Sequence, residues 1–192
     1  IYLTVSIIGW IITLFFLYSI TDESILIHIG RANFGFATLI AFFSVWFAYL
    51  FPIKSFRVHP YVTYVYTGVS LLLIALTLFT DRIDKSESIT QSGLKTEYGD
   101  WYFFFVAHFV VSMLVVCGIL LLKNRALKEL QRAQVRNFIF GFITVIVLAT
   151  VTNIALPLMG NFEFQKISPL FTTVYSYAIA HTILRYNLLN IK

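Results

Sequence analysis

Polar side chains within long apolar segments are the residues of this sequence that could do chemistry. His108 lies in the apolar segment 101–122, and His181 lies near the end of the segment 169–185. Because burial of a polar group in an apolar medium is costly, each such residue is a candidate for a functional site. The two histidines could serve as axial ligands of a haem iron. We favour the simpler interpretation, in which both form hydrogen bonds at helix contacts.

A second polar feature is the segment TVTNIALPLMG, residues 150–160. Pro157 has no backbone N–H, so the carbonyl group of Asn153 loses its hydrogen bond within the helix. We therefore predict a kink in which Asn153 and Pro157 form a hinge and a polar notch that faces neighbouring helices. The notch either contacts a ligand or is satisfied by an adjacent Thr or a water molecule, and the sequence leaves both open.

The last apolar segment carries a polar residue at every fourth position, which places these residues on one helix face. Such a stripe should turn toward the bundle or toward a partner subunit. Tryptophans in two other segments are either packing residues or part of a pocket wall. The candidate ligand-binding residues are therefore Trp10, Trp46, His108, Asn153, Tyr177 and His181.

Catalytic motifs are absent from this sequence. It contains neither a Gly-rich phosphate-binding loop nor an HExxH zinc motif, and its single cysteine, Cys117, excludes a disulfide framework. All nine acidic residues fall outside the apolar segments, which weighs against a transporter coupled to protons or cations. We therefore assign no catalytic residue, no metal and no cofactor to this chain.

The composition is that of a membrane protein. Hydrophobic residues make up 59% of the 192 residues and charged residues only 12%, whereas soluble domains carry about 25% charged residues. The net charge of +5 is explained by basic cytoplasmic loops and anionic lipid headgroups, so we expect no nucleic-acid partner. The expected fold is an all-α, polytopic helix bundle that forms a single transmembrane domain, residues 1–192.

Six segments are long enough to cross a bilayer, which requires about 20 apolar residues. These are residues 1–20, 32–51, 61–80, 101–122, 137–159 and 169–185. Asp100 could cap the fourth helix, and Ser168 with the following proline could begin the last one.

The distribution of Lys and Arg over the loops predicts the orientation. Nine lie in the loops 52–59 and 123–136 and in the tail after residue 184, and five lie on the other side. The richer side should be cytoplasmic, and so should the C-terminus. Because the sequence begins with Ile1 inside an apolar run, we expect one further helix upstream and seven in all.

Several short motifs in the second half of the chain resemble the seven-helix membrane region that precedes the kinase core of bacterial sensor histidine kinases. The motifs are Tyr98–Gly99 before a span; Gln134, Arg136 and Gly141 in and after a basic loop; Asn153, Pro157 and Gly160; Ser168, Pro169 and Leu170; and the helix exit Arg185, Tyr186, Leu188 and Ile191. The first half is similar in hydropathy alone. Asn187 and Asn190 depart from the family, which commonly has a basic and an acidic residue there.

The resemblance implies a signal-input domain in the bacterial cytoplasmic membrane. Such a domain would detect an unknown small or hydrophobic ligand and pass the change through Arg185, Tyr186, Leu188 and Ile191 to a cytoplasmic kinase module of the same chain. This segment would itself be no enzyme. Leu184, Leu188 and Ile191 form a seam suited to a coiled coil, which predicts a homodimer. A transporter or channel subunit, and a bis-histidine haem protein, remain the alternatives.

Overall fold

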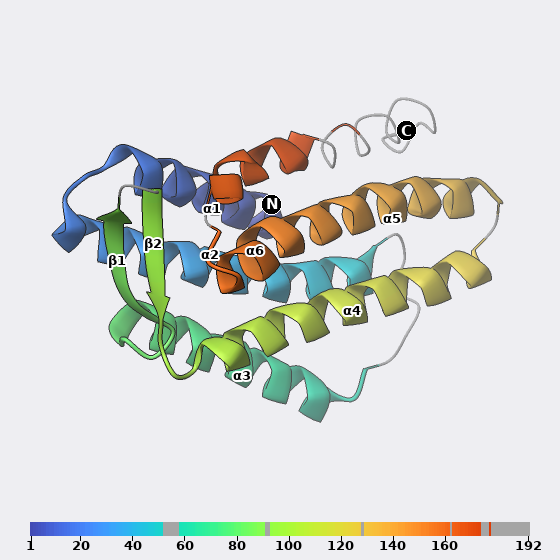
Figure 1. Ribbon diagram of the computed structural model, residues 1–192. Coiled ribbons are helices and arrows are strands. Elements are labelled where there is room, and N and C mark those ends of the chain that lie inside the picture. Colours follow the sequence, from blue (N-terminus) through green and yellow to red (C-terminus); the bar gives the residue numbers. More distant parts are fainter. Residues whose placement is uncertain (52–57, 91–92, 128, 162, 174–176, 178–192) are drawn as a thin grey trace.

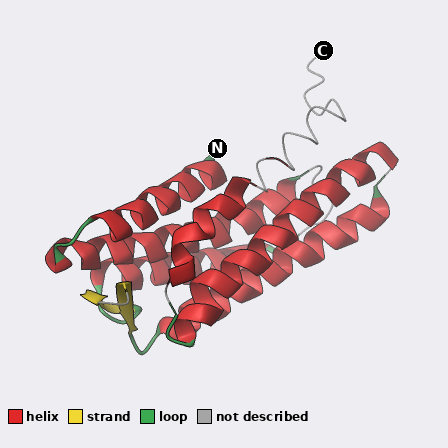
Figure 2. Cartoon of the chain, turned by 45° about the horizontal axis from the view of Figure 1, so that its top comes forward, coloured by secondary structure: helices red, strands yellow, loops and turns green. Residues whose placement is uncertain are grey.

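The computed structural model describes residues 1–192 except 52–57, 91–92, 128, 162, 174–176 and 178–192. It is a bundle of helices with one β-hairpin at one end of the bundle (Figure 1 and Figure 2). The long helices are α1 (Tyr2–Ser19), α2 (Glu23–Leu50), α3 (Pro60–Phe79), α4 (Tyr102–Ala126) and α5 (Glu129–Thr150). The strands are β1 (Asp84–Thr90) and β2 (Gly93–Tyr98), and a π-helix (Val151–Ala155), α6 (Leu156–Leu158) and a 3-10 helix (Glu163–Ile167) follow α5.

Five helices in the described part of the chain are long and apolar enough to cross a membrane. They correspond to the first five predicted spans and are compatible with a multi-pass membrane protein. Most of the sixth predicted span, 169–185, lies outside the described residues. Residues 168–173, which are described, are helical. His181 and the predicted signal-transmitting residues Arg185, Tyr186, Leu188 and Ile191 also lie outside them.

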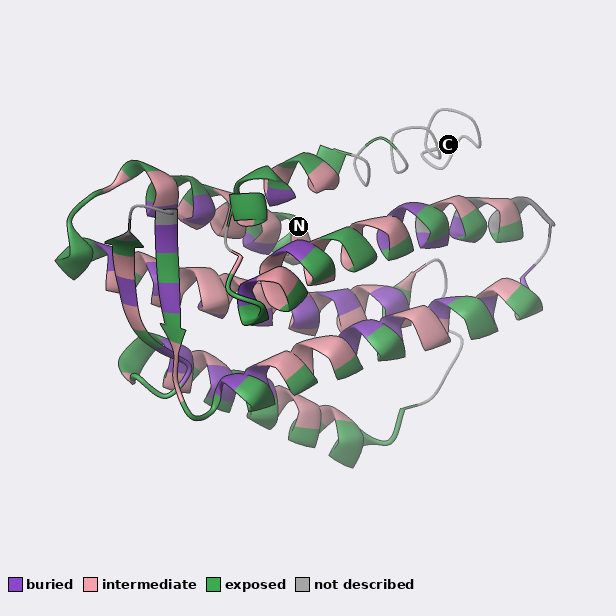
Figure 3. Cartoon of the chain, viewed as in Figure 1, coloured by how far each residue is buried: buried purple, intermediate pink, exposed green. Residues whose placement is uncertain are grey.

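Exposed residues occur along all five of these helices (Figure 3), and many of them are large and apolar. Phe79 is 82% exposed, Phe103 72% and Leu114 65%. A soluble monomer does not present apolar surface on this scale. These residues therefore form the surface that hydrocarbon chains would cover.

The second helix begins nine residues earlier than the predicted span 32–51. Asp22 caps α2, because its carboxylate accepts a hydrogen bond from the backbone N–H of Ser24 at 2.9 Å. The polar residues that follow, His28 and Arg31 among them, are therefore helical and not part of a loop. With 28 residues, α2 is about 42 Å long and extends beyond a hydrocarbon core of about 30 Å.

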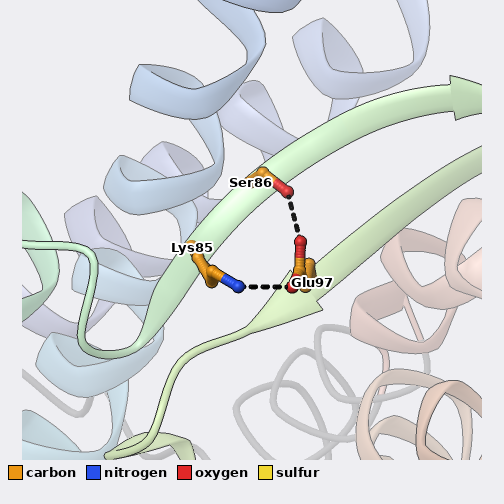
Figure 4. Close-up of polar contacts among 3 residues, drawn as sticks. All are labelled: Lys85, Ser86 and Glu97. Carbon is orange, nitrogen blue, oxygen red and sulfur yellow. Dashed lines mark hydrogen bonds and ion pairs between the residues drawn. The ribbon is translucent and has the colours of Figure 1, made fainter.

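The β-hairpin corrects the expectation of an all-α fold. The segment 81–100 has too many polar residues to read as a strand pair by hydropathy, yet β1 and β2 pair antiparallel from Asp84 opposite Tyr98 to Thr90 opposite Gly93. On the hairpin's outer face, Lys85 Nζ and Ser86 Oγ donate hydrogen bonds to the carboxylate of Glu97, at 2.6 and 3.1 Å (Figure 4).

A β-bulge at Lys85 sets which side chains of β1 face the bundle. Asp84 pairs with Tyr98, but the next pair is Ser86 with Glu97, so Lys85 is the extra residue. In a regular strand, Asp84 and Glu87 would point to opposite faces. The bulge brings both to the inner face, where Asp84 is fully buried and Glu87 is 5% exposed.

The helices α2, α4 and α5 enclose the largest apolar core, which includes Ala48, Val116, Leu120 and Phe142. At one end of this core the fully buried Lys123 donates to three backbone carbonyl groups at the end of α2. The side chain therefore satisfies groups that the end of a helix leaves without an intrahelical partner.

The start of α4 differs from the sequence prediction. Its N-cap is Trp101 and not Asp100, which is exposed and lies 3.6 Å from the guanidinium of Arg82. Gly99 lies so close to the backbone of Arg82 that a Cβ atom could not fit. The Tyr-Gly pair before this span therefore has a steric reason: it allows the chain to turn from β2 into α4.

Candidate ligand site

A long, narrow cavity lies between α1, α2, α4, α5 and the hairpin, with a volume of about 150 Å³. Along α2 its wall extends from Gly30 to Ser44, about 21 Å at 1.5 Å per residue. Most of the wall is apolar, with Ile7, Leu14, Ile40, Phe109, Met113 and Val145 among the lining residues. A cavity of this size and lining can admit an apolar guest as large as benzene.

The hairpin provides the polar end of this cavity. Glu87 and Thr96 line it from neighbouring strands, and Gly30 lines it from α2. The Thr96 hydroxyl lies 3.0 and 2.9 Å from the two carboxylate oxygens of Glu87, to which it can donate. Asp84 lies beside them, and neither of its carboxylate oxygens has a hydrogen-bond partner among the described residues.

Both carboxylates converge on the backbone of Gly30. A Cβ atom at this position would lie 2.5 Å from Asp84 Oδ2 and 2.8 Å from Glu87 Oε1. Only glycine therefore lets the acidic face of β1 seat against α2. Arg31, the next residue of α2, donates from Nε to the backbone carbonyl oxygen of Asp84 at 3.4 Å. This hydrogen bond therefore involves the backbone of β1 and not the Asp84 carboxylate.

Burial changes the proton affinity of this pair. It raises the pKa of the Asp84 carboxyl well above its ordinary value, although the Arg31 guanidinium opposes the rise. Burial also raises the pKa of Glu87, and the nearby Asp84 raises it further. The docked hairpin therefore favours the protonated form of these groups unless a cation lies beside them.

Further polar groups lie along the α1 side of the cavity. The Asn33 side chain donates from Nδ2 to the carbonyl oxygen of Trp10 at 3.1 Å and to the Thr13 hydroxyl at 2.9 Å. Gln165 accepts a hydrogen bond from the Tyr18 hydroxyl at 3.0 Å. These bonds connect α1 to α2 and to the 3-10 helix, so both elements are positioned relative to the cavity.

The helix changes type at the residues predicted to form the hinge. The helix continues from α5 as the π-helix, which places Asn153 in the cavity wall, and then as α6, which contains Pro157. The Asn153 amide donates to the carbonyl of Ala149 at 3.0 Å and to the Ser168 hydroxyl at 2.9 Å. π-Helical turns of this kind occur frequently at functional sites.

Ser168 connects the hinge to the next helical segment. Its hydroxyl also lies 2.8 Å from the Thr152 hydroxyl, with both residues buried. The polar side chains of the notch thus form hydrogen bonds with adjacent hydroxyl groups. This is one of the two possibilities that the sequence left open. The other also stands, because Asn153 lines the cavity.

The six candidate ligand-binding residues do not form one site. Trp10 and Asn153 line the cavity, whereas Trp46 lines a separate shallow hollow between α2 and α3. Tyr177 is 72% exposed, and His181 lies outside the described residues. The structure therefore brings two of the six candidates into the same cavity wall.

His108 belongs to a polar cluster inside the bundle. Its Nε2 lies 3.0 Å from the Ser70 hydroxyl, and its ring stacks on Tyr66 with centroids 5.6 Å apart. The Tyr66 hydroxyl in turn lies 3.0 Å from the Ser112 hydroxyl. This cluster joins α3 to α4, as the interpretation of helix-contact histidines predicts. Within the described residues, no three His, Cys, Asp or Glu side chains are arranged to hold a metal ion.

Sequence reasoning missed the acidic end of the cavity. Asp84 and Glu87 stand among Lys, Ser and Thr residues, a setting typical of a solvated loop. Their burial depends on the bulge at Lys85 and on the absence of a side chain at Gly30, and neither gives a hydropathy signal. The pattern of alternating Leu94, Thr96 and Tyr98 in β2 was the one local indication of a strand.

Comparisons with known protein families, with curated proteins and with solved structures find no match for this chain.

Proposed function

We propose that this chain is the membrane-embedded input domain of a bacterial sensor histidine kinase. A small apolar or amphipathic ligand occupies the cavity and changes the packing around Asn153. The change passes through the last helix to a kinase module of the same polypeptide on the cytoplasmic side, and the protein acts as a homodimer. In this orientation the hairpin lies outside the bacterial cytoplasmic membrane.

The observation that carries this proposal is the extent of the cavity. Its wall includes Glu87 of the hairpin at one place and Asn153 of the hinge at another. A ligand in the cavity would touch both the hairpin and the hinge. It therefore has a physical route to bias the hinge, which a ligand bound only at the surface of the hairpin would lack.

The hinge has groups that can exchange partners. The hydroxyls of Thr152 and Ser168 and the amide of Asn153 lie within hydrogen-bond distance of one another. A π-helix can revert to a regular α-helix by a local change of register. A ligand that binds one arrangement better than the other shifts the population between them, by an amount set by its differential affinity.

The test fills the cavity with protein atoms. Ala37 lines it from α2, so Ala37→Leu should occupy the space of a ligand. Ala107, exposed on α4, provides the matched control Ala107→Leu. In the full-length protein reconstituted in nanodiscs, we expect Ala37→Leu to change basal autophosphorylation at least threefold and to abolish the response to stimulus, with no change in Ala107→Leu.

A second readout does not depend on a kinase. Spin labels at Val147 and Leu170, both exposed, report the distance across the hinge once Cys117 is replaced by alanine. Ala37→Leu should shift the distance distribution. An unchanged distribution together with unchanged output overturns the proposal. Substrate flux in liposomes that Ala37→Leu blocks, with no output module in the full-length chain, would instead favour a transporter.

A further inference from the structure

We propose that the ligand of this cavity is an amphipathic cation: a protonated or quaternary amine that lies beside Glu87 and Asp84, with an apolar tail along the bundle interior. This inference rests on the proposed function, since it names the chemistry of the ligand that the sensor detects. The argument depends on the charge balance of the polar end and on the direction of the cavity.

When both carboxyl groups of the hairpin's inner face are ionised, the charged groups described around them lack one positive charge. Two carboxyl groups are buried there, and the positive charge of Arg31, on α2, acts on Asp84. Its Nε is directed to the carbonyl oxygen of Asp84, and Arg31 is half-buried. The other titratable groups that face the pair are phenols: Tyr18 of α1 and Tyr98 of β2. A single ammonium group would complete the balance.

The two carboxyl groups can also accept more hydrogen bonds than the described donors around them supply. Ionised carboxyl groups offer about four acceptor positions each. Glu87 has the single hydroxyl of Thr96, and the side chain of Asp84, fully buried, has no hydrogen-bond partner among the described residues. A primary ammonium has three donors. Buried charges are normally paired, so these acceptors favour a cationic head over an anionic or a neutral one.

Of the two carboxyl groups, Glu87 lines the cavity, which leads from there into apolar surroundings. Beyond Glu87 and Thr96 its wall passes Leu14 and Leu17 of α1 and continues along α2 as far as Ser44. Each buried methylene group contributes about 0.8 kcal/mol, so the tail supplies affinity and the head supplies direction. Trp10 in the same wall is a natural reporter of the tail.

Protons compete with such a cation. At low pH both carboxyl groups are protonated and neutral, and an ammonium gains little there. As the pH rises through their raised pKa values, the groups ionise and attract the cation, provided that the amine itself stays protonated. Amine binding should therefore strengthen as the pH rises from acidic through neutral to mildly alkaline values.

The experiment uses three probes of equal length: hexylamine, hexanol and hexanoate. They are titrated at pH 7.5 into the protein in nanodiscs, with Trp46 and Trp101 replaced by phenylalanine so that Trp10 alone fluoresces. We expect saturable binding of hexylamine at least tenfold tighter than that of hexanol, and no binding of hexanoate. Glu87→Gln should weaken hexylamine binding at least tenfold and reduce its pH dependence to the part that Asp84 contributes.

Two variants make the result specific. Glu97→Gln changes the same residue type on the outer face of the same hairpin and should leave the titration unchanged. Arg31→Gln removes the competing cation and should tighten hexylamine several-fold, a gain that a misfolded protein cannot give. If Glu87→Gln fails to fold, the tighter binding of hexylamine to Arg31→Gln still tests the proposal.

The outcomes separate this inference from the proposed function. Hexanol or hexanoate that binds as tightly as hexylamine, or hexylamine that is insensitive to both Glu87→Gln and Arg31→Gln, overturns the cationic ligand. If Ala37→Leu still abolishes binding of hexanol in that case, the cavity remains a ligand site. If Ala37→Leu changes neither probe binding nor output, the proposed function fails as well.

Discussion

The Lys123 ammonium group donates a hydrogen bond to the carbonyl oxygen of Ala48 at 2.9 Å and so fastens α4 to the end of α2. It also donates to the carbonyls of Tyr49 at 2.7 Å and Phe51 at 2.8 Å. All three protons of the ammonium thus have an acceptor at the negative end of the α2 dipole. These favourable bonds offset the cost of burying a charged group.

Replacement of this lysine tests that arrangement. Lys123→Met keeps the length of the side chain but leaves three carbonyl groups without their donor, so we expect a loss of about 2–3 kcal/mol of stability. Thermal unfolding in detergent micelles measures it. Lys85→Met, at an exposed ion pair of the hairpin, serves as the control and should change the melting temperature little. Equal melting temperatures in the two variants would contradict the capping role.

The contact between the hairpin and α2 predicts an unusual response at Gly30. Gly30→Ala places a methyl group against both buried carboxylates, so we expect it to displace the hairpin at a cost of about 1–3 kcal/mol. Gly118→Ala, on α4 with open space around it, should instead be neutral or stabilising by up to about 1 kcal/mol. Protease cleavage of the hairpin distinguishes the variants: faster cleavage is expected in Gly30→Ala alone.

Docking of the hairpin should depend on pH in the absence of ligand. The raised pKa values of Asp84 and Glu87 mean that the docked state holds protons that the undocked state releases. Docking is therefore fully stabilised below the ordinary carboxyl pKa of about 4 and weakens as the pH rises through the raised values. Amide hydrogen exchange of β1 and β2, corrected for its intrinsic pH dependence, measures this change. The Asp84→Asn, Glu87→Gln double variant should show a flat profile.

The proline of the hinge offers a further test. Pro157→Ala supplies the missing N–H, so the π-helix can give way to a regular α-helix that bonds the carbonyl of Asn153. We expect a folded protein whose signalling output is biased toward one state. The measurement is kinase output with and without stimulus. Output equal to that of the unmodified protein in both conditions removes Pro157 from signal transfer.

The orientation in the membrane can be measured directly. We expect the hairpin outside and α5 to begin in the cytoplasm, from the distribution of Lys and Arg. Single cysteines at Ile89, exposed on β1, and at Ala133, near the start of α5, are introduced after Cys117→Ala. A membrane-impermeant thiol reagent added to intact cells should label position 89 and not position 133. The reverse pattern would place the predicted output end outside the cell.

Long apolar segments were predictable from the sequence, because a helix that crosses lipid must show about 20 apolar residues in a row. The departure from a regular α-helix before Pro157 was also predictable, since proline removes a backbone donor wherever it stands. The start of α2 was missed because Glu23, His28 and Arg31 interrupt the apolar residues of the stretch 23–31, although Asp22 is a good N-cap residue. Residue types near a helix end thus carried information that hydropathy did not.

The acidic end of the cavity could not be predicted for a different reason. Alternation along β1 would separate Asp84 from Glu87, and only the bulge at Lys85 reunites them. The contact with Gly30 joins residues more than 50 positions apart in the sequence, and local sequence patterns cannot predict such a long-range contact. Among the candidate residues, Trp10 and Asn153 line the cavity, because polar or large aromatic residues inside a bundle tend to face its interior.

The bulge has a consequence for how this strand can change in evolution. Loss of the single residue Lys85 would leave Asp84 and Glu87 two positions apart, on one face of a regular strand. A protein one residue shorter here would therefore keep the same pair of carboxyl groups toward the bundle. Deletion of Lys85 is thus compatible with an unchanged pair of buried carboxyl groups, whereas a substitution of Glu87 at constant length is not.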